Sequence, residues 1–414
     1  MRFAHLADIH LGFQKYEALQ KIEQEVFERA LDDCITKKVD FILIPGDLFH
    51  VNIPEMRVQK FAFRKFKEIH DLGIPVYVVY GSHDFSPVSN SVIDLLVETG
   101  YLTKVTKVIG VDQKIHLDFM VDKKTGALIA GLSGLKAGKD SMWYEKLDRE
   151  SLESVPGFKI FLFHGGLDEM KTEETAEGDF MPLSLLPRNF DYYAGGHLHT
   201  FSHQKYSDYP NVVYPGTVFA GYHSDLEENA KGRKRGYVLV DFDDKVNNVE
   251  FVEIPNVKYE YVEIDAKNKA SKSVNSELAG KVLEIDASGK VIVIRVEGEL
   301  AQGKTSDVDF FLAKRVLKEK GALEIKINQN KLSSREYKIT EAAGRNKEEI
   351  ESNVFKENIG QLRINQKELL SDSGVDVAKK LLAALSMPIL ENEKKQDYAK
   401  RVEQTALDIL GLSK

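Results

Sequence analysis

The stretch that decides the fold is Leu6-Ala7-Asp8-Ile9-His10-Leu11-Gly12, in which an aspartate and a histidine follow directly on an apolar run, Arg2–Ala7. Four similar clusters lie further along the chain: Gly46-Asp47-Leu48-Phe49-His50, Gly81-Ser82-His83-Asp84, His164-Gly165-Gly166 and Gly195-Gly196-His197-Leu198-His199. Each begins where a short apolar run ends, so each is expected at the carboxyl end of a strand, where open α/β sheets place their sites. We therefore expect the five clusters to converge on one cleft.

Acidic and imidazole side chains dominate these clusters, a ligand set that suits manganese, iron or zinc better than calcium. Two such ions held about 3.5–4 Å apart stabilise the attacking and leaving oxygens of an in-line displacement. The neighbouring glycines permit sharp turns and close approach of ligands. In Asp8-Ile9-His10 and His197-Leu198-His199 the spacing sends both side chains the same way if the backbone stays extended. The pattern predicts a two-metal hydrolytic centre.

The bulk properties of the 414 residues are those of an ordinary globular protein, with 43% hydrophobic and 29% charged residues. A net charge of −8 argues against a protein that coats nucleic acid, although a local basic run such as Lys231-Gly232-Arg233-Lys234-Arg235 can still contact phosphates. The single cysteine, Cys34, cannot form an intrachain disulfide, which suits a reducing cytoplasm. The apolar runs are too short to span a membrane, and the amino terminus lacks the pattern of a signal peptide.

Four segments differ in their patterning. Residues 1–255 alternate apolar runs with amphipathic segments, which indicates a layered α/β domain. Residues 256–334 follow the order strand, helix, strand and form a small α+β domain, after which residues 335–373 are a polar linker. Residues 374–414 contain two amphipathic helices separated by Met387-Pro388. Their apolar stripes favour docking on a partner helix or coiled coil over packing on the chain's own core.

In the order and spacing of the five clusters, together with Tyr214-Pro215-Gly216-Thr217, the sequence resembles the calcineurin-like metallophosphoesterases. Within that superfamily it looks most like the Mre11/SbcD nucleases of double-strand-break repair, in a short archaeal-type form. The resemblance implies a β-sandwich flanked by helices, a capping domain that contacts DNA, and a helical tail that binds a Rad50/SbcC-type ATPase. It also implies manganese-dependent exonuclease and endonuclease activity on DNA ends and single strands, and a homodimer.

Carried over by position, the resemblance implies seven metal ligands: Asp8, His10 and His199 for one ion, Ser82, His164 and His197 for the second, and Asp47 bridging both. His83 would act as transition-state stabiliser or as general acid to the leaving 3′ oxygen, and His50 would orient the phosphate or the DNA end. The superfamily usually has asparagine at the position of Ser82. A hydroxyl is shorter than an amide, so Ser82 binds directly, or a water fills the gap, or the second ion is held weakly.

Two other functions fit the same residues. A phosphatase of this superfamily would usually carry an arginine soon after the Gly-Asp aspartate to hold a phosphomonoester, and the presence of His50 near that point favours a diester. A catalytically weak scaffold that binds DNA ends is motivated by Ser82. The histidines outside the clusters are expected to be structural: His5, His70, His116, His203 and His223.

Overall fold

The computed structural model describes residues 1–85, 91–111, 114–134, 140–171, 180–335, 355–356, 372–388, 390, 393 and 395–410. They divide into two units, which we describe separately. The first comprises Met1–Tyr261, Ala287–Val293 and Gly321–Lys326, and the second comprises Val262–Asp286, Ile294–Lys320 and Ile327–Lys414. The domain limits expected from the sequence, at residues 255, 334 and 373, stay predictions.

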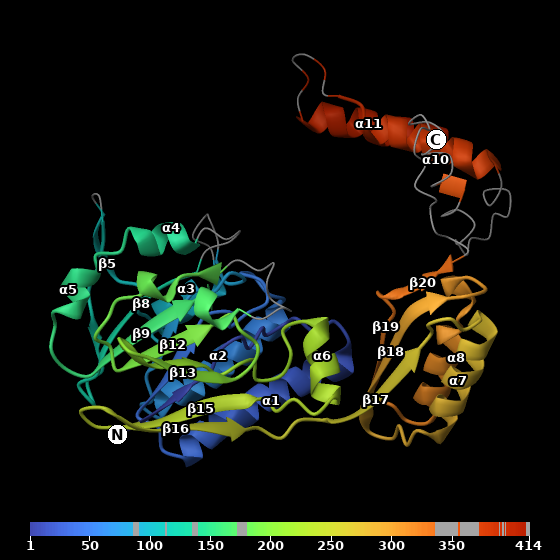
Figure 1. The fold of residues 1–414 in the computed structure, drawn as a ribbon. Coiled ribbons are helices and arrows are strands. Elements are labelled where there is room, and N and C mark those ends of the chain that lie inside the picture. Colours follow the sequence, from blue (N-terminus) through green and yellow to red (C-terminus); the bar gives the residue numbers. More distant parts are fainter. Residues whose placement is uncertain are drawn as a thin grey trace. The chain divides into compact units, whose positions relative to one another are not determined.

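Two six-stranded sheets form the centre of the first unit (Figure 1). The first sheet has the order β16 (Val246–Glu253), β15 (Gly236–Phe242), β1 (Arg2–His5), β2 (Phe41–Pro45), β3 (Val76–Val79) and β4 (Thr103–Lys104). The second has the order β13 (Ser202–Tyr206), β14 (Tyr209–Tyr214), β12 (Tyr192–Gly196), β9 (Lys159–His164), β8 (Leu128–Leu132) and β7 (Met120–Val121). Strands β1 to β4 are parallel, as are β8, β9, β12 and β14, so their carboxyl ends meet at one edge of each sheet.

Three apolar clusters separate four layers, which are helices, the first sheet, the second sheet and further helices. Between the sheets, the ring of Phe3 stacks on Phe41 at 5.1 Å and meets Tyr192 of the other sheet edge-on at 5.1 Å. The outer face of the first sheet packs against α1 (Glu17–Thr36) and α2 (Met56–Asp71), and Cys34 is buried there as expected. The outer face of the second sheet packs against α4 (Asp140–Glu145) and α5 (Arg149–Glu153). The predicted sandwich flanked by helices is confirmed.

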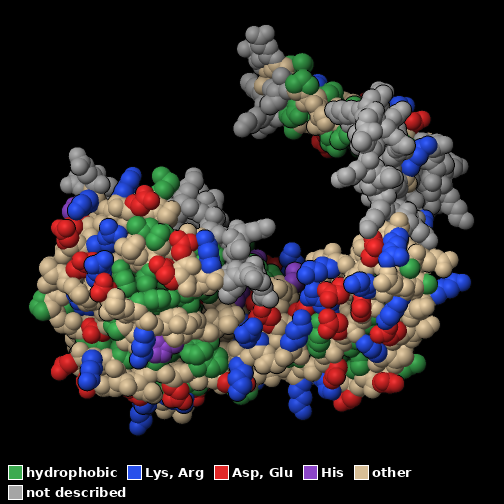
Figure 2. All heavy atoms as spheres, viewed as in Figure 1, with side chains coloured by type: hydrophobic (Ala, Val, Ile, Leu, Met, Phe, Trp, Pro, Cys, Tyr) green, Lys and Arg blue, Asp and Glu red, His purple; other side chains and the backbone are tan. Residues whose placement is uncertain are grey.

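Smaller elements complete the first unit: α3 (Val92–Glu98), β5 (Val108–Val111), β6 (Ile115–Leu117), β10 (Gly166–Leu167), β11 (Phe180–Met181), α6 (His223–Ala230) and short 3-10 turns at Asp168–Met170 and Leu183–Leu185. The first strand ends at His5, earlier than the sequence suggested, and Ala7 forms only an isolated bridge to Thr217. Over the visible face, Lys and Arg side chains are interspersed with Asp and Glu, in keeping with the modest net charge (Figure 2).

The second unit contains an α+β part and a helical part. It contains α7 (Ser271–Glu284), a 3-10 turn at Thr305–Asp307, α8 (Phe310–Glu319), β20 (Leu332–Ser334), α10 (Asp372–Leu385) and α11 (Lys395–Ile409), while β17 (Lys258–Asp265), β18 (Lys290–Leu300) and β19 (Glu324–Asn328) each have residues in both units. The sheet order is β17-β18-β19, with β20 beside β18. Helix α7 was not anticipated. Most of the expected linker lies outside the described residues, and none of the helices described is long and apolar enough to cross a membrane.

A buried carboxylate, Glu23 of α1, ties this helix to the loop that follows His10. Its Oε2 accepts the backbone N–H of Gly12 at 2.8 Å, and its Oε1 accepts that of Gln14 at 3.3 Å. Burial raises the pKa of Glu23 to about 8, although these N–H groups act in the opposite direction. The folded chain therefore holds this carboxyl protonated at pH values where the unfolded chain has released the proton.

We expect this proton to give a measurable pH dependence of stability. Because the folded pKa exceeds the ordinary value of 4.5, the free energy of unfolding falls as pH rises from about 4.5 to about 8. Glu23→Gln should flatten this pH dependence, in which the total change in the free energy of unfolding is no more than about 5 kcal/mol. Urea unfolding of both proteins at pH 5, 6.5 and 8 measures it, with exposed Glu25→Gln as control. Parallel stability curves for parent and Glu23→Gln contradict the prediction.

Candidate metal centre

The backbone at the metal clusters is left-handed at four non-glycine residues. Asp8, His10 and Asp47 have φ of 50°, 51° and 49°, and His197 has φ of 96°. The extended backbone assumed for the two paired motifs is therefore wrong. Conformations of this kind cost about 1–3 kcal/mol each and persist only where the surroundings impose them. Here the loops after β1 and β2 are joined by backbone hydrogen bonds, among them His10 N–H to Asp47 O at 2.9 Å.

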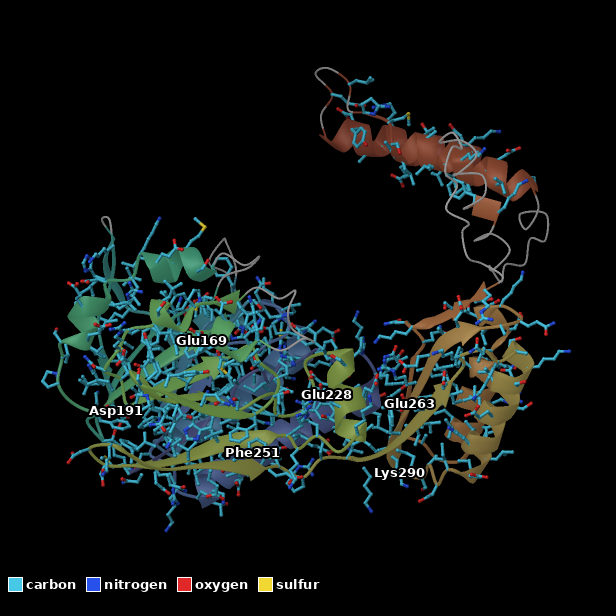
Figure 3. All side chains as sticks on the ribbon, viewed as in Figure 1. Glu169, Asp191, Glu228, Phe251, Glu263 and Lys290 are labelled. Carbon is cyan, nitrogen blue, oxygen red and sulfur yellow. The ribbon has the colours of Figure 1, made fainter. Side chains whose placement is uncertain are left out.

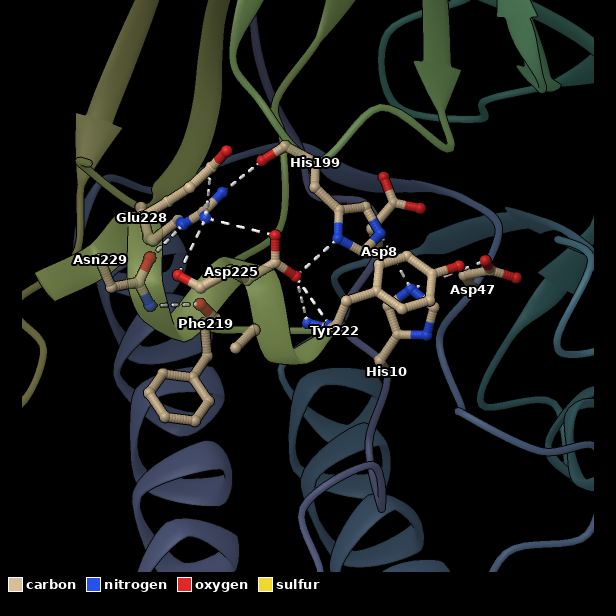
Figure 4. Close-up of polar contacts among 12 residues, drawn as sticks. Asp8, His10, Asp47, His199, Phe219, Tyr222, Asp225, Glu228 and Asn229 are labelled. Carbon is tan, nitrogen blue, oxygen red and sulfur yellow. Dashed lines mark hydrogen bonds and ion pairs between the residues drawn. The ribbon is translucent and has the colours of Figure 1, made fainter. Parts of the chain in front are cut away.

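These kinks bring side chains from both sheets together. One group consists of Asp8, His10 and His199, and a second of Asp8, Asp47 and His164, with the ligand atoms of each group within 4.8 Å of one another. Nε2 of His10 lies 3.2 Å from Nε2 of His199, and Nε2 of His164 lies 3.3 Å from Asp47 Oδ2. Figure 4 shows Asp8, His10, Asp47 and His199 around one point. The convergence expected at the carboxyl ends of the strands is present.

Glycines make this close approach possible. A Cβ on Gly46 would collide with the ring of His164, and one on Gly221 would collide with the rings of His10 and His199. Gly46 belongs to a motif and was expected to permit such approach. Gly221 lies outside the clusters, and its place against two imidazoles was not foreseen.

Hydrogen bonds fix which nitrogen of two rings faces the centre. Nδ1 of His199 lies 2.8 Å from Asp225 Oδ2, and Nδ1 of His164 lies 3.0 Å from the carbonyl oxygen of Pro45. Because both oxygens accept, each Nδ1 carries a hydrogen, and each Nε2 is the nitrogen that can present a lone pair to a cation. This arrangement is typical of histidines that bind metal ions.

His83 and His50 lie beside the acidic groups. Nδ1 of His83 donates to the carbonyl oxygen of His50 at 2.7 Å, and the two rings stack at 4.8 Å. Nε2 of His83 faces the hydroxyl of Tyr222 at 3.3 Å. Together with His10, these histidines form a third group whose ring nitrogens lie within 4.8 Å. His83 thus presents Nε2 at the edge of the centre, and its backbone N–H donates to Asp47 at 2.8 Å.

The remaining expected ligands are less tightly grouped. The ring of His197 lies 5.4 Å from that of His164, and its backbone N–H donates to both oxygens of Asp8, at 2.9 and 3.0 Å. Ser82 is partly exposed in the turn after β3, between Gly81 and His83. The carboxylate of Asp84, the residue after His83, accepts the backbone N–H groups of Leu48 and Phe49 in the loop after β2 and that of Gly81 in the loop after β3.

Burial and mutual charge govern ionisation in the centre. Burial raises the pKa of Asp8 to about 6, against the charges of His199 and His164. Burial alone would also raise the pKa of Asp47, but the charges of His164 and His10 outweigh it and hold that pKa well below its usual value. Burial lowers the pKa of His10 and of His197, the latter to about 4, so both rings are neutral at pH 7.

This donor set fits divalent cations. The buried carboxylates of Asp8 and Asp47 lie side by side, next to His164. Burial lowers the pKa of His164, but Asp47 outweighs this effect and raises that pKa to about 10, so a protonated His164 supplies positive charge beside the two carboxylates. Cations can take over that role, because neutral imidazoles and carboxylates are ligands for manganese, iron and zinc. The buried Nδ1 of His50 and the buried Nδ1 of His10 have no hydrogen-bond partner among the described residues.

Asp225, at the start of α6, contacts the candidate ligand His199, and the sequence did not reveal this residue. Besides His199, its carboxylate accepts the N–H groups of Gly221 and Tyr222, each at 2.8 Å, and an N–H of buried Arg235 at 3.4 Å (Figure 4). It stands in no motif. The ring of His223, two residues earlier in the chain, lies 5.3 Å from that of Phe13, and its structural role stays a prediction.

We expect Asp225→Asn to weaken metal binding by about 10- to 100-fold, because an amide does not hold the His199 tautomer and orientation as a carboxylate does. Calorimetric titration with manganese measures the change. A matched control exists in Asp148, which bonds His116 Nδ1 at 3.0 Å away from the centre. Asp148→Asn should bind manganese like the parent; equal losses in both variants contradict the role of Asp225.

The comparisons with known proteins agree with this site. The family model for calcineurin-like phosphoesterases matches residues 1–201. The chain is 27% identical to the Mre11 double-strand break repair protein of Methanocaldococcus jannaschii over 282 residues, 66% of this chain and 71% of that protein. It is 26% identical to the Mre11 protein of Archaeoglobus fulgidus over 371 residues, 82% and 80% of the two chains.

A Bacillus subtilis protein named as an uncharacterized metallophosphoesterase, YhaO, is 25% identical over 65% of this chain and 64% of its own. Together with the ligand groups at the sheet edges, these matches confirm the resemblance drawn from the motifs. Residues 1–201 thus match the calcineurin-like phosphoesterase family, and the chain as a whole is similar to the Mre11 DNA repair proteins.

Proposed function

We propose that the chain is a manganese-dependent DNA nuclease that hydrolyses phosphodiester bonds at broken ends with two metal ions. The observation that carries the proposal is the pair of ligand groups, Asp8-His10-His199 and Asp8-Asp47-His164, built from the strand ends of two sheets. The similarity of the chain to Mre11 DNA repair proteins supports DNA as the substrate of this phosphoesterase chemistry.

The assignment of the metal ligands is the one that the resemblance implies, and the two groups of ligand atoms support it for Asp8, His10, Asp47, His164 and His199. Asp8, His10 and His199 would hold one ion, and Ser82, His164 and His197 would hold the other, with Asp47 between them. Divalent cations supply Lewis acidity and a hydroxide nucleophile at neutral pH. The chain contributes a buried, pre-aligned ligand set in which Asp225 and Pro45 keep two rings in the required tautomer.

His83 is the group we assign to the leaving oxygen. Its Nδ1 hydrogen is committed to the His50 carbonyl, so Nε2 is the atom that can deliver a proton to a departing 3′ oxygen. His50 packs on His83 and on Phe13, whose ring lies 4.7 Å away. From there it would orient the phosphate or the DNA end.

The partners belong to the same proposal. Helix α10 exposes Leu382 and Leu385, and Leu410 is exposed directly after α11; a coiled-coil partner would cover these apolar residues. We assign these helices to a Rad50/SbcC-type ATPase and expect a homodimer, as the resemblance implies. Co-purification of full-length chain with such an ATPase, lost in Leu385→Asp, tests the assignment.

The nuclease assignment is tested by comparing two substrates with manganese present. End-labelled linear duplex should be shortened stepwise, while a generic phosphomonoester is turned over little. Brisk monoester hydrolysis with intact DNA would instead identify a phosphatase. DNA binding without turnover of either substrate would identify a scaffold.

Ser82→Asn should bind the second manganese ion more tightly than the parent, because an amide oxygen reaches further and is a better neutral donor than a hydroxyl. Titration calorimetry of both proteins would show a second, weaker binding event in the parent that strengthens in the variant. Superimposable titrations would contradict this prediction and show that Ser82 already binds fully or takes no part.

A further inference from the structure

A cleft of about 610 Å³ lies next to the metal centre and takes no part in the chemistry above. It is lined by two phenyl rings, three cations and one acid: Phe201, Phe251, Lys231, Arg233, Lys234 and Glu228. Figure 3 marks Glu228 on α6 and Phe251 on β16, the elements that bound the cleft. All of these residues belong to the first unit.

The aromatic part of the cleft is accessible. The rings of Phe201 and Phe251 lie 4.8 Å apart at 36°, and Phe201 is 38% exposed although it is a large apolar side chain. A phenyl face open to solvent is a surface on which an unpaired nucleotide base stacks, whatever its identity.

The cationic part of the cleft can accept phosphates. Lys231, Arg233 and Lys234 pair with acids at 2.8, 3.5 and 2.8 Å, and the side chain of Lys234 is 71% exposed. The Arg233 and Lys234 pairs are exposed on both sides and contribute little to stability, so a phosphate can replace their carboxylates, whereas Glu227, the partner of Lys231, is buried. The acid in the lining, Glu228, is already paired with buried Arg235 at 3.2 Å. The lining therefore presents positive charge to a ligand.

The cleft is joined to the metal centre through the backbone and through Arg235. Phe201 follows His199 by two residues, which places their Cα atoms at most about 7 Å apart. Arg235 donates to the carbonyl oxygen of His199 and pairs with Glu228 on the cleft side (Figure 4). At a rise of roughly 3.4 Å per nucleotide, this spacing corresponds to about two nucleotides of a strand.

We propose that the cleft binds the unpaired DNA strand beside the scissile phosphate, with one base stacked on Phe201 and the flanking phosphates on Arg233 and Lys234. The proposal rests on the nuclease function above. It selects a single strand because the faces of duplex bases are already covered by their neighbours.

Binding without divalent cations tests the cleft separately from catalysis. The full chain is titrated into fluorescent oligothymidylate and into a blunt hairpin duplex, and anisotropy is read. Phe201→Ala should weaken binding of the single strand at least about fivefold and change duplex binding little, and Phe201→Trp should restore it. Replacing Arg233 and Lys234 by serine should reduce the slope of log affinity against log salt by about 0.7 for each lost contact. The control is Trp143→Ala, an aromatic residue 39% exposed on α4, which should bind both DNAs like the parent.

Three results overturn the proposal: unchanged affinity in Phe201→Ala, equal losses for single strand and duplex, or competition by polyglutamate as strong as by oligothymidylate. With manganese added, the ratio of DNA cleavage to cleavage of bis(p-nitrophenyl) phosphate should fall in Phe201→Ala; an equal fall of both would place the effect on His199. If the chain binds oligothymidylate through Phe201 but cleaves no diester, only the nuclease assignment is refuted. If the parent and Phe201→Ala cleave DNA equally fast, only the proposed role of the cleft is refuted.

Discussion

Asp47→Ala should abolish manganese binding and lower DNA cleavage by at least ~10³-fold. Asp47 Oδ2 lies 3.3 Å from His164 Nε2 and 3.7 Å from His10 Nε2, so its carboxylate touches both ligand groups. Losing the charge removes the anion that both cations would share, which corresponds to several kcal/mol of barrier. Calorimetry with manganese and a nuclease assay measure the two effects.

The isosteric variant Asp47→Asn separates charge from structure. Asparagine can still accept the backbone N–H of His83, which Asp47 Oδ1 accepts at 2.8 Å, and so keeps the loop in place. Both variants should be inactive, and Asp47→Asn should unfold at the parent's temperature or above. Cleavage by Asp47→Asn within tenfold of the parent would refute the bridging role.

His83→Ala should retain manganese binding and lose about 10²–10⁴-fold in DNA cleavage, or roughly 3–5 kcal/mol of barrier. Nδ1 of His83 donates to the carbonyl oxygen of His50, and Nε2 faces the hydroxyl of Tyr222. We therefore expect His83 to transfer a proton and not to bind a metal ion together with the carboxylates. Single-turnover cleavage with saturating manganese measures the loss. His70→Ala, on the solvent side of α2, is the control and should cut DNA like the parent.

A good leaving group distinguishes acid catalysis from mere alignment. A p-nitrophenyl ester of thymidine phosphate needs no proton on its departing oxygen. If His83 is the general acid, His83→Ala should hydrolyse this ester nearly as fast as the parent. An equal loss on both substrates would assign His83 to alignment or charge stabilisation.

The sequence predicted the sheets well because apolar runs of the core leave a strong signal. The apolar run Gly236–Phe242 coincides with β15, and the apolar runs that start at Phe41, Val76 and Lys159 begin where β2, β3 and β9 begin. The helix α7 was missed since its apolar residues, such as Val274 and Leu278, are separated by polar and small ones that weaken the stripe.

The site was predictable as a set of residue types and less so as a geometry. Asp8, Asp47 and His164 could be recognised as candidate ligands because each follows or ends an apolar run, and parallel strands end at the same edge of a sheet. The left-handed backbone at Asp8 and His10 carried no sequence signal, because aspartate and histidine also occur widely in other conformations. Asp225 was missed for a related reason: its role depends on where α6 meets His199 in space, far away along the chain.

The division of the ligands between two sheets has a consequence for folding. Asp8 and Asp47 come from one sheet and His164 and His199 from the other, so the centre exists only after the sheets have docked. Ions bound there would act as cross-links between the halves of the sandwich and would raise its apparent stability with the logarithm of their concentration. Docking joins segments far apart in the chain, a slow, late step by topology. The complete ligand set therefore arises at the end of folding, and a nascent or partly folded chain has no assembled centre.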